Sequence, residues 1–417
     1  MTDQIADMRA RARRIFDSAV RAADPVPALR QHLKTAPRPR GGGRQIVISV
    51  GKAAPAMMAE AMAHFGSGCT ALAITHRGNE ADSGGAPLRH AGHPLPDQAG
   101  HDAAREVIAL LDEAGPQDQV IALISGGGSA LMPAPAGTLT LEDKIAVNKL
   151  LLASGLGIEE MNLIRQQLSE LKGGGFLRHA EPAPVTAYIL SDVIGDDLRA
   201  IASGPTVAPI GSRAEAARLA RSAGFWDRLP QPVRAHLEKT CPPPTTPTAT
   251  NILIGSNRLS LEAMATTAGR SARIVNDHLV GDVADAAELV VETLRQEATR
   301  GPAALIFGGE TTVRLSGTGL GGRNQEMALR VAMAAERLLP GRWVFLSGGT
   351  DGRDGPTDAA GGLVDSDTVT RLRMAGADPA ALLANNDSNR ALDLSGDLLV
   401  TGATGTNVAD VQLLLIE

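Results

Sequence analysis

The chain has 417 residues, enough for about two or three domains, and 43% of them are hydrophobic, which is ample for buried cores. Its formal net charge of −6 gives no electrostatic reason to expect nucleic acid or an anionic membrane as a partner. No apolar run approaches the roughly 20 residues of a membrane span, and the two distant cysteines, Cys69 and Cys241, form no C-x-x-C pair that would favour a zinc or dithiol site. We therefore expect a cytoplasmic globular protein.

The charged N-terminal segment, residues 1–21, predicts a helix and lacks the uninterrupted apolar core of a signal peptide. This helix is expected to pack either on its own body or on a second copy, so a homodimer is one expected arrangement. Further helices, rich in Ala, Leu, Glu and Arg, are predicted at residues 53–64, 99–113, 141–154, 215–223, 283–299 and 325–338.

Short apolar runs alternate with these helices. Several of them, such as VIALI and AALIF, are apolar on both faces, as central strands covered by helices are. The sequence therefore predicts an α/β fold with mainly parallel sheets. The predicted strands are residues 45–50, 71–75, 119–124, 185–190, 251–254, 273–275, 303–307, 343–346 and 397–400.

The segment CPPPTTPTAT, residues 241–250, is too rich in proline for a helix interior or a central strand. It predicts a linker between an N-terminal domain, residues 1–240, and a C-terminal domain, residues 251–417. The alternative is a long surface loop within one domain.

Glycines cluster where the predicted strands end. Gly51 and Lys52 follow one strand, the SGGGS segment 125–129 follows another, Asp192 ends a third, and Gly309 and Glu310 follow a fourth. Ligands of open α/β sheets bind outside the carboxyl ends of the strands, and glycine lets backbone N–H groups approach a phosphate there. Several such loops together predict a phosphate or anion site.

Two other kinds of phosphate site are not supported. The P-loop consensus fails at Gly51-Lys52, and the protein-kinase motifs H-R-D and D-F-G are absent.

The G-x-G-x-x-G at residues 317–322 lacks the acidic residue that a dinucleotide-binding motif would have about 20 positions later. Only 12 residues follow the TGATG segment at 401–405, too few for a crossover helix and a second strand. Neither glycine pattern therefore supports dinucleotide binding.

Phosphoryl transfer needs cations around the moving group and carboxylates that hold a metal. Lys52 and Arg323 are the best cations, because each stands beside glycine at a predicted helix start. Asp192 and Asp351 are the best acids, and either can hold Mg²⁺ or accept the proton of a substrate hydroxyl. For each of the four residues the alternative is a helix cap or a surface ion pair.

The order of these motifs resembles the class II glycerate kinases (glycerate 2-kinases), whose C-terminal half is called the MOFRL domain. The resemblance implies phosphorylation of D-glycerate to 2-phosphoglycerate with ATP and Mg²⁺. It also implies a Rossmann-like N-terminal domain, a MOFRL-type C-terminal α/β domain, and an active site in the cleft between them. The matching segments are VGKAA from Val50, AGHPLPD from Ala91, SGGGSALM from Ser125, NLIRQQLSELKGG from Asn162, SDVIGDD from Ser191, IASGPT from Ile201, FGGET from Phe307, GGRNQE from Gly321 and SGGTDGRDGPTDAAG from Ser347.

The resemblance places Lys52 and Arg323 at the catalytic centre. Asp192 and Asp351, chosen above from their positions at strand ends, are the expected catalytic acids and tentative metal ligands. Arg165, together with Lys172, is expected to meet the substrate carboxylate, since Arg pairs with carboxylates in a bidentate manner. His93 either contacts the substrate or shapes its proline-flanked loop. The residues expected to bind nucleotide or phosphate are Gly51, Ser125, Gly126, Gly127, Gly128, Ser129, Lys172, Gly309, Glu310 and Asn324.

The sequence departs from the family pattern at one loop. Gln166 and Gln167 replace a basic pair, and Gly175 stands where an arginine is common. These departures leave the affinity for the substrate, or the identity of the hydroxy acid, open.

Two other functions are kept as alternatives. Relatives of these kinases have been labelled hydroxypyruvate reductases, an NAD(P)H-dependent activity of tartrate and glyoxylate metabolism, but the sequence lacks a complete dinucleotide fingerprint. A non-catalytic sensor of a sugar acid or nucleotide would need the glycine loops, but not the lysine, the arginine and both aspartates together.

Overall fold

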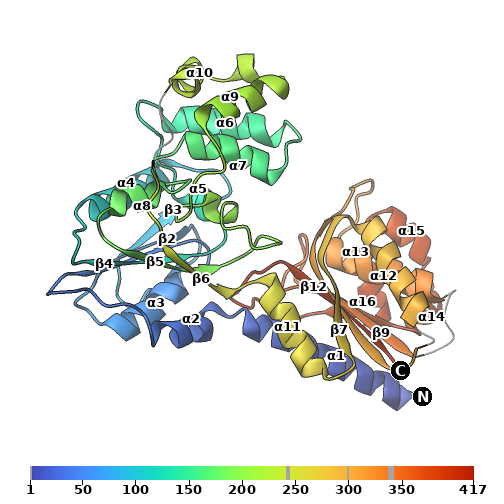
Figure 1. Ribbon diagram of the computed structural model, residues 1–417. Helices are drawn as coiled ribbons and strands as arrows, with labels where there is room; N and C mark the ends of the chain where they lie inside the picture. Colours follow the sequence, from blue (N-terminus) through green and yellow to red (C-terminus); the bar gives the residue numbers. More distant parts are fainter. Residues whose placement is uncertain (1, 241–244, 298–299, 337–341) are drawn as a thin grey trace. The chain divides into compact units, whose positions relative to one another are not determined.

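The computed structural model describes residues 2–240, 245–297, 300–336 and 342–417, which form two compact units (Figure 1). We call them by their sheets. The parallel-sheet unit comprises Pro25–Ser191 and Asp196–Ile254. The mixed-sheet unit comprises Met1–Asp24, Asp192–Gly195 and Gly255–Glu417.

This division differs from the predicted domains at three places. The N-terminal segment and the four residues 192–195 belong with the C-terminal part of the chain, and residues 251–254, predicted to begin the C-terminal domain, belong to the parallel-sheet unit. The predicted linker, residues 241–250, begins with four residues that lie outside the described ones, and its last residue, Thr250, already belongs to a strand.

The sheet of the parallel-sheet unit has the strand order β3-β2-β1-β4-β5-β6. The pairs β3–β2, β2–β1, β1–β4 and β4–β5 are all parallel. Three of its strands are buried along their whole length, which explains why their sequences are apolar on both faces. The strands are β1 (Gln45–Val50), β2 (Thr70–His76), β3 (Leu88–Ala91), β4 (Gln119–Ile124), β5 (Val185–Leu190) and β6 (Thr250–Gly255).

Helices cover both faces of this sheet, α2 and α3 on one and α4 and α8 on the other (Figure 1). Helices α6, α7, α9 and α10 pack on one another around a separate apolar core. The helices are α2 (Pro25–Leu33), α3 (Ala54–Phe65), α4 (Gln98–Asp112), α5 (Gly128–Leu131), α6 (Leu141–Leu152), α7 (Ile158–Gln167), α8 (Gly175–Ala180), α9 (Arg213–Ser222) and α10 (Gln231–Glu238), with short 3₁₀ turns η1 (Ile201–Ser203) and η2 (Trp226–Arg228).

The sheet of the mixed-sheet unit has the order β11-β10-β9-β12-β8-β7. Only β7 and β8 pair in parallel, whereas β12 runs antiparallel to both β8 and β9. The α/β class is confirmed, but this sheet differs from the expected parallel pairing. Strand β12 inserts antiparallel between β8 and β9, and β10 is antiparallel to both β9 and β11. The strands are β7 (Ala272–Asp282), β8 (Ala303–Thr312), β9 (Trp343–Gly349), β10 (Gly361–Asp365), β11 (Leu398–Leu399) and β12 (Asp410–Ile416).

Helices α1 and α11 cover one face of this sheet, and α12 and α13 cover the other (Figure 1). The N-terminal helix is thus part of its own chain's core: Phe16 is fully buried, and Arg9 forms ion pairs with Asp365 at 2.5 Å and with Asp397 at 2.8 Å. The helices are α1 (Thr2–Ala22), α11 (Asn257–Ala268), α12 (Val283–Glu297), α13 (Arg323–Glu336), α14 (Thr368–Met374), α15 (Pro379–Ala384) and α16 (Ser388–Ser395).

Within the described ranges, no helix is both long enough and apolar enough to cross a membrane.

Candidate functional site

Two glycine loops of the parallel-sheet unit are joined to each other at the carboxyl ends of β1 and β4. The Ser125 N–H donates to the Val50 carbonyl at 2.9 Å, and the Lys52 N–H donates to the Gly126 carbonyl at 2.8 Å. A Cβ at Gly51, whose φ is +128°, would lie 2.1 Å from Ser125 Oγ. Position 51 therefore requires glycine, and this close approach holds Lys52 against the second loop.

Lys52 and His93 meet at Gly127. A Cβ on this glycine would lie 3.2 Å from His93 Nε2 and 3.4 Å from Lys52 Cγ. The ring of His76, at the end of β2, lies 6.4 Å from that of His93. Desolvation, and then the charges of Lys52 and His76, lower the pKa of His93, so its ring is neutral near pH 7.

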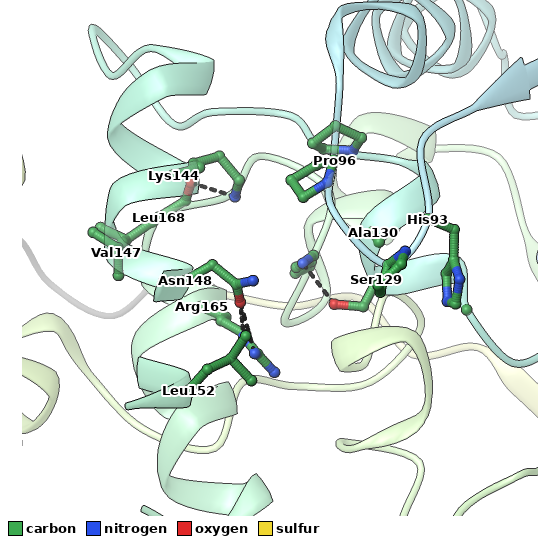
Figure 2. A pocket seen from close by; sticks show the side chains of 14 residues that line it. His93, Pro96, Ser129, Ala130, Lys144, Val147, Asn148, Leu152, Arg165 and Leu168 are labelled. Atoms are coloured by element: carbon green, nitrogen blue, oxygen red, sulfur yellow. Dashed lines mark hydrogen bonds between the residues drawn. The ribbon is translucent and has the colours of Figure 1, made fainter. Parts of the chain in front are cut away.

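A cavity of about 260 Å³ opens beside these loops, within the parallel-sheet unit (Figure 2). Figure 2 shows Lys144, Asn148 and Arg165 on one wall, across from Ser129 and His93. Three cationic side chains line it, those of Lys144, Arg165 and Lys172, and none of its fourteen lining residues is acidic. Among the described residues, none of these three cations forms an ion pair.

Lys172 connects the cavity to the glycine loop. Its Nζ donates to Ser129 Oγ at 2.8 Å, and that hydroxyl lies 2.9 Å from Ser203 Oγ, which in turn donates to Asn162. The lysine is buried, and desolvation, with the charges of Lys144 and Arg165 second, lowers its pKa well below the ordinary value. Its described hydrogen-bond partner is a neutral hydroxyl, so no carboxylate balances the charge of its ammonium form.

Lys144 and Arg165 likewise have neutral partners. Lys144 Nζ donates to the Leu168 carbonyl at 2.9 Å. The Nε and one terminal nitrogen of Arg165 donate to Asn148 Oδ1, at 3.1 and 2.7 Å. Desolvation first, and then the charge of Arg165, lower the pKa of Lys144 to about 7. Desolvation also lowers the pKa of Arg165.

The three departures from the family pattern have structural explanations here. The buried Gln166 amide donates to two backbone carbonyls, at 3.1 and 3.2 Å, and the Gln167 amide donates to one at 2.8 Å. A Cβ at Gly175 would lie 1.8 Å from the Glu170 carbonyl oxygen. None of the three lines the cavity. The two glutamines instead hold backbone segments together, and Gly175 lets the backbone carbonyl of Glu170 come close.

The second cluster lies in the mixed-sheet unit, around Arg323 at the start of α13. Its guanidinium pairs with the buried Asp410 through two hydrogen bonds, of 2.5 and 3.0 Å, and lies 3.1 Å from Glu310. The hydrogen bond and charge of Asp410 outweigh desolvation and raise the pKa of Arg323, so the guanidinium is permanently charged. Gly309 is directly opposite Asp410 in the sheet, and a Cβ there would lie 2.2 Å from the Leu279 carbonyl oxygen.

Asp354 caps the helix that carries Arg323. Its carboxylate accepts the N–H groups of Asn324 at 3.1 Å and Gln325 at 2.8 Å. Desolvation raises the pKa of Asp354 to about 6 despite these bonds. The buried Asn324 side chain also accepts from Ser347 Oγ at 2.6 Å, so its observed contacts hold the helix start in place.

Acidic side chains surround this cluster. Desolvation raises the pKa of Glu310, and the charges of Asp410, Asp192 and Asp351 raise it further against the effect of Arg323. Asp351 accepts the Arg353 N–H at 3.0 Å and so shapes its own turn. A divalent cation would relieve this repulsion, and carboxylate oxygens are ligands that Mg²⁺ takes. The acids therefore fit such an ion in kind, although no three His, Cys, Asp or Glu in the described part of the chain gather as a metal-binding group.

The structure distributes the predicted site residues over the two units. The parallel-sheet unit holds Gly51, Lys52, His93, Ser125, Gly126, Gly127, Gly128, Ser129, Arg165 and Lys172. The mixed-sheet unit holds Asp192, Gly309, Glu310, Arg323, Asn324 and Asp351.

Sequence reasoning missed five residues of these clusters. Lys144 and Asn148 are four positions apart in a predicted helix, so they share one face of it. This pair of polar residues on one helix face was the signal that could have pointed to them. His76 directly follows the predicted strand 71–75, and Lys52 stands two residues past the predicted strand 45–50. Asp354 and Asp410 carried no comparable signal, since each acts through a partner far away in the sequence.

The fold and the sites together define a two-unit α/β protein with a cation-lined cavity beside the glycine loops of its parallel sheet. Two family models match this chain: "Domain of unknown function (DUF4147)" over residues 11–238 and "MOFRL family" over residues 303–410. The chain belongs to the glycerate kinase family, as the order of its motifs indicated.

Similar proteins carry two kinds of name. A D-glycerate 2-kinase of Thermotoga maritima is 38% identical, with 89% of this chain and 91% of the relative covered. A protein of Agrobacterium vitis, provisionally named a hydroxypyruvate reductase, is 41% identical over 97% of this chain and 93% of its own. The crystal structure of a Thermotoga maritima glycerate kinase superimposes with a TM-score of 0.91 at 36% identity, covering 99% of this chain and 100% of that one.

Proposed function

We propose that this protein is a glycerate kinase that transfers the γ-phosphoryl group of ATP to D-glycerate and releases 2-phosphoglycerate. The family supports the reaction class. The observation that carries the proposal is the cavity lined by three cations without acidic partners, beside two joined glycine loops. Such a site suits a small carboxylate next to a phosphate.

The residues of the parallel-sheet unit supply binding and proton transfer in this proposal. Arg165 pairs with the carboxylate of glycerate, and the 125–129 loop and Lys52 bind phosphate oxygens. The substrate hydroxyl oxygen forms a bond to the γ-phosphorus, while the bond from that phosphorus to the β–γ bridging oxygen breaks. ADP leaves with the electron pair. The hydroxyl proton moves to Nε2 of His93, the neutral base that lines the cavity.

The mixed-sheet unit supplies the remaining charges. Asp192 and Asp351 are the residues that would hold Mg²⁺, which when bound would neutralise phosphate charge. Arg323, fixed by Asp410, adds a permanent positive charge that stabilises negative charge on the phosphoryl group. EDTA treatment is expected to abolish turnover, and added Mg²⁺ to restore it.

The proposal is tested by incubating the protein with ATP, Mg²⁺ and D-glycerate and coupling the product directly to enolase, which accepts 2-phosphoglycerate only. We expect a signal that disappears in Lys52→Ala and in Arg323→Ala and persists in Arg258→Ala, a matched change at an exposed ion pair. A signal that needs phosphoglycerate mutase would mean phosphorylation at C3. Consumption of NADH with hydroxypyruvate, without kinase activity, would replace the proposal with the reductase.

A further inference from the structure

The cationic side chains of the cavity differ in their partners from two arginines of the mixed-sheet unit. Arg323 and Arg371 in the mixed-sheet unit pair with buried carboxylates, as buried cations usually do. Lys144, Arg165 and Lys172 meet only a carbonyl, an amide and a hydroxyl oxygen. When both lysines are protonated, the cavity carries a charge of +3 with no counter-charge among the described residues, which is more than one carboxylate can balance.

The three cations also stand on different elements. Lys144 belongs to α6 and Arg165 to α7, while Lys172 precedes α8 and reaches toward the glycine loop. In the hydrogen bonds described, each lysine ammonium uses one of its three N–H groups, so donors remain for a ligand. The arrangement can therefore contact two separated anionic groups of one small molecule.

We propose that this cavity binds the phosphorylated three-carbon acid, carrying both a carboxylate and a phosphoryl group, more tightly than it binds unphosphorylated glycerate, and that Lys144 determines this preference. The inference rests on the proposed function for the identity of the acid, 2-phosphoglycerate. A phosphoryl group carries about −1.5 to −2 at pH 7, so with its carboxylate the molecule approaches the charge of −3 that the three cations require.

The position of the loop gives the phosphoryl group a direction. Ser129, bonded to Lys172, belongs both to the cavity and to the loop assigned to nucleotide phosphates, so the phosphoryl end lies toward Ser129. Lys144 and Arg165 lie on the other wall (Figure 2). There Arg165 takes the carboxylate, and the Lys144 ammonium completes the charge balance between the two ends.

Binding without nucleotide tests the inference. Isothermal titration with 2-phosphoglycerate and with D-glycerate should show the phosphorylated acid binding at least about tenfold more tightly. Lys144→Gln should weaken the binding of 2-phosphoglycerate by about ten- to a hundredfold, as expected for the loss of a hydrogen bond between charged groups. The binding of glycerate should weaken much less. Lys149→Gln, on the exposed side of the same helix, is the matched control and should change neither. Lys144→Arg keeps the charge and should retain most of the preference.

Several outcomes would overturn the inference. Equal affinity for the two acids would do so, as would equal losses in Lys144→Gln and Lys149→Gln. A titration with ADP separates nucleotide phosphates from the product: if Lys144→Gln weakens ADP as strongly as 2-phosphoglycerate, the cavity belongs to the nucleotide. If the protein turns over ATP and glycerate but binds 2-phosphoglycerate no more tightly than glycerate, this inference is refuted and the proposed kinase function stands. The predicted binding without turnover refutes the kinase and leaves the phosphorylated-acid site.

Discussion

The ion pair between Arg323 and Asp410 provides a direct measure of how firmly the mixed-sheet unit fixes its arginine. The Asp410 side chain is 1% exposed and that of Arg323 is 34% exposed, and two hydrogen bonds join them. Hydrogen bonds to charged groups contribute about 1.5–3 kcal/mol, and a buried carboxylate left without its partner is expensive. We expect Arg323→Gln and Asp410→Asn each to lower the free energy of unfolding by about 2–4 kcal/mol, and the double variant to lose about 2 kcal/mol less than the sum.

Urea unfolding of the four proteins gives this coupling energy. Trp343 is buried in β9, and a Trp226→Phe background removes the chain's other tryptophan, so fluorescence reports on the mixed-sheet unit alone. The exposed pair Arg258–Glu262 is the control, with an expected coupling below about 0.5 kcal/mol. A coupling energy for Arg323 and Asp410 as small as the control's would refute the reasoning, because it would mean that the two side chains do not hold each other.

Three further predictions concern pH and glycine. Lys144 has a pKa of about 7, and a bound anion should raise this pKa, so the affinity for 2-phosphoglycerate should fall as the pH rises above about 7. The proton uptake on binding can be measured by titration calorimetry in buffers of different ionisation heat. An affinity that does not depend on pH would contradict this prediction. Gly51→Ala places a Cβ 2.1 Å from Ser125 Oγ and should lower the free energy of unfolding by about 3 kcal/mol or more. Gly42→Ala, also at positive φ but with no atom within 4 Å of the new Cβ, should lower it by about 1–2 kcal/mol. Equal losses in the two variants would exclude the steric argument. The pKa of Asp354 is about 6 in the folded protein against an ordinary 3.8, so the native state holds the proton longer than the unfolded state, and the free energy of unfolding should fall by about 2–3 kcal/mol between pH 4 and 6; urea unfolding should show no such slope in Asp354→Asn.

The strand-end loops were predictable because their signal is local. A buried strand reads as an unbroken apolar run, and the glycine, lysine or serine that follows it marks the carboxyl edge of the sheet. The sequence therefore predicted that Gly51, Lys52 and Ser125 lie at the carboxyl ends of strands. The structure adds that their two loops are joined by hydrogen bonds. Their catalytic roles stay predictions.

The mixed sheet was harder to predict because its pairing is not local. Strand β12 forms from the residues after the TGATG segment, which were too few for a crossover helix; they need none, since the strand inserts antiparallel between β8 and β9. Lys144 was missed for a different reason. A lysine in a polar helix is ordinarily solvated, and only the packing of α6 beside α7 turns it toward Arg165.

Helix α1 is synthesised before the elements on which it packs, α11, β9 and β12, the last of which ends at Ile416. At translation rates of about 5–20 residues per second, roughly 20–80 s separate the helix from its final partner. Through that interval the complete sheet that its apolar side covers, with Met8 and Phe16, is not yet available, whereas the parallel-sheet unit is complete once residue 254 has been made. The order of synthesis therefore makes the mixed-sheet unit the later of the two to have all of its residues available for folding.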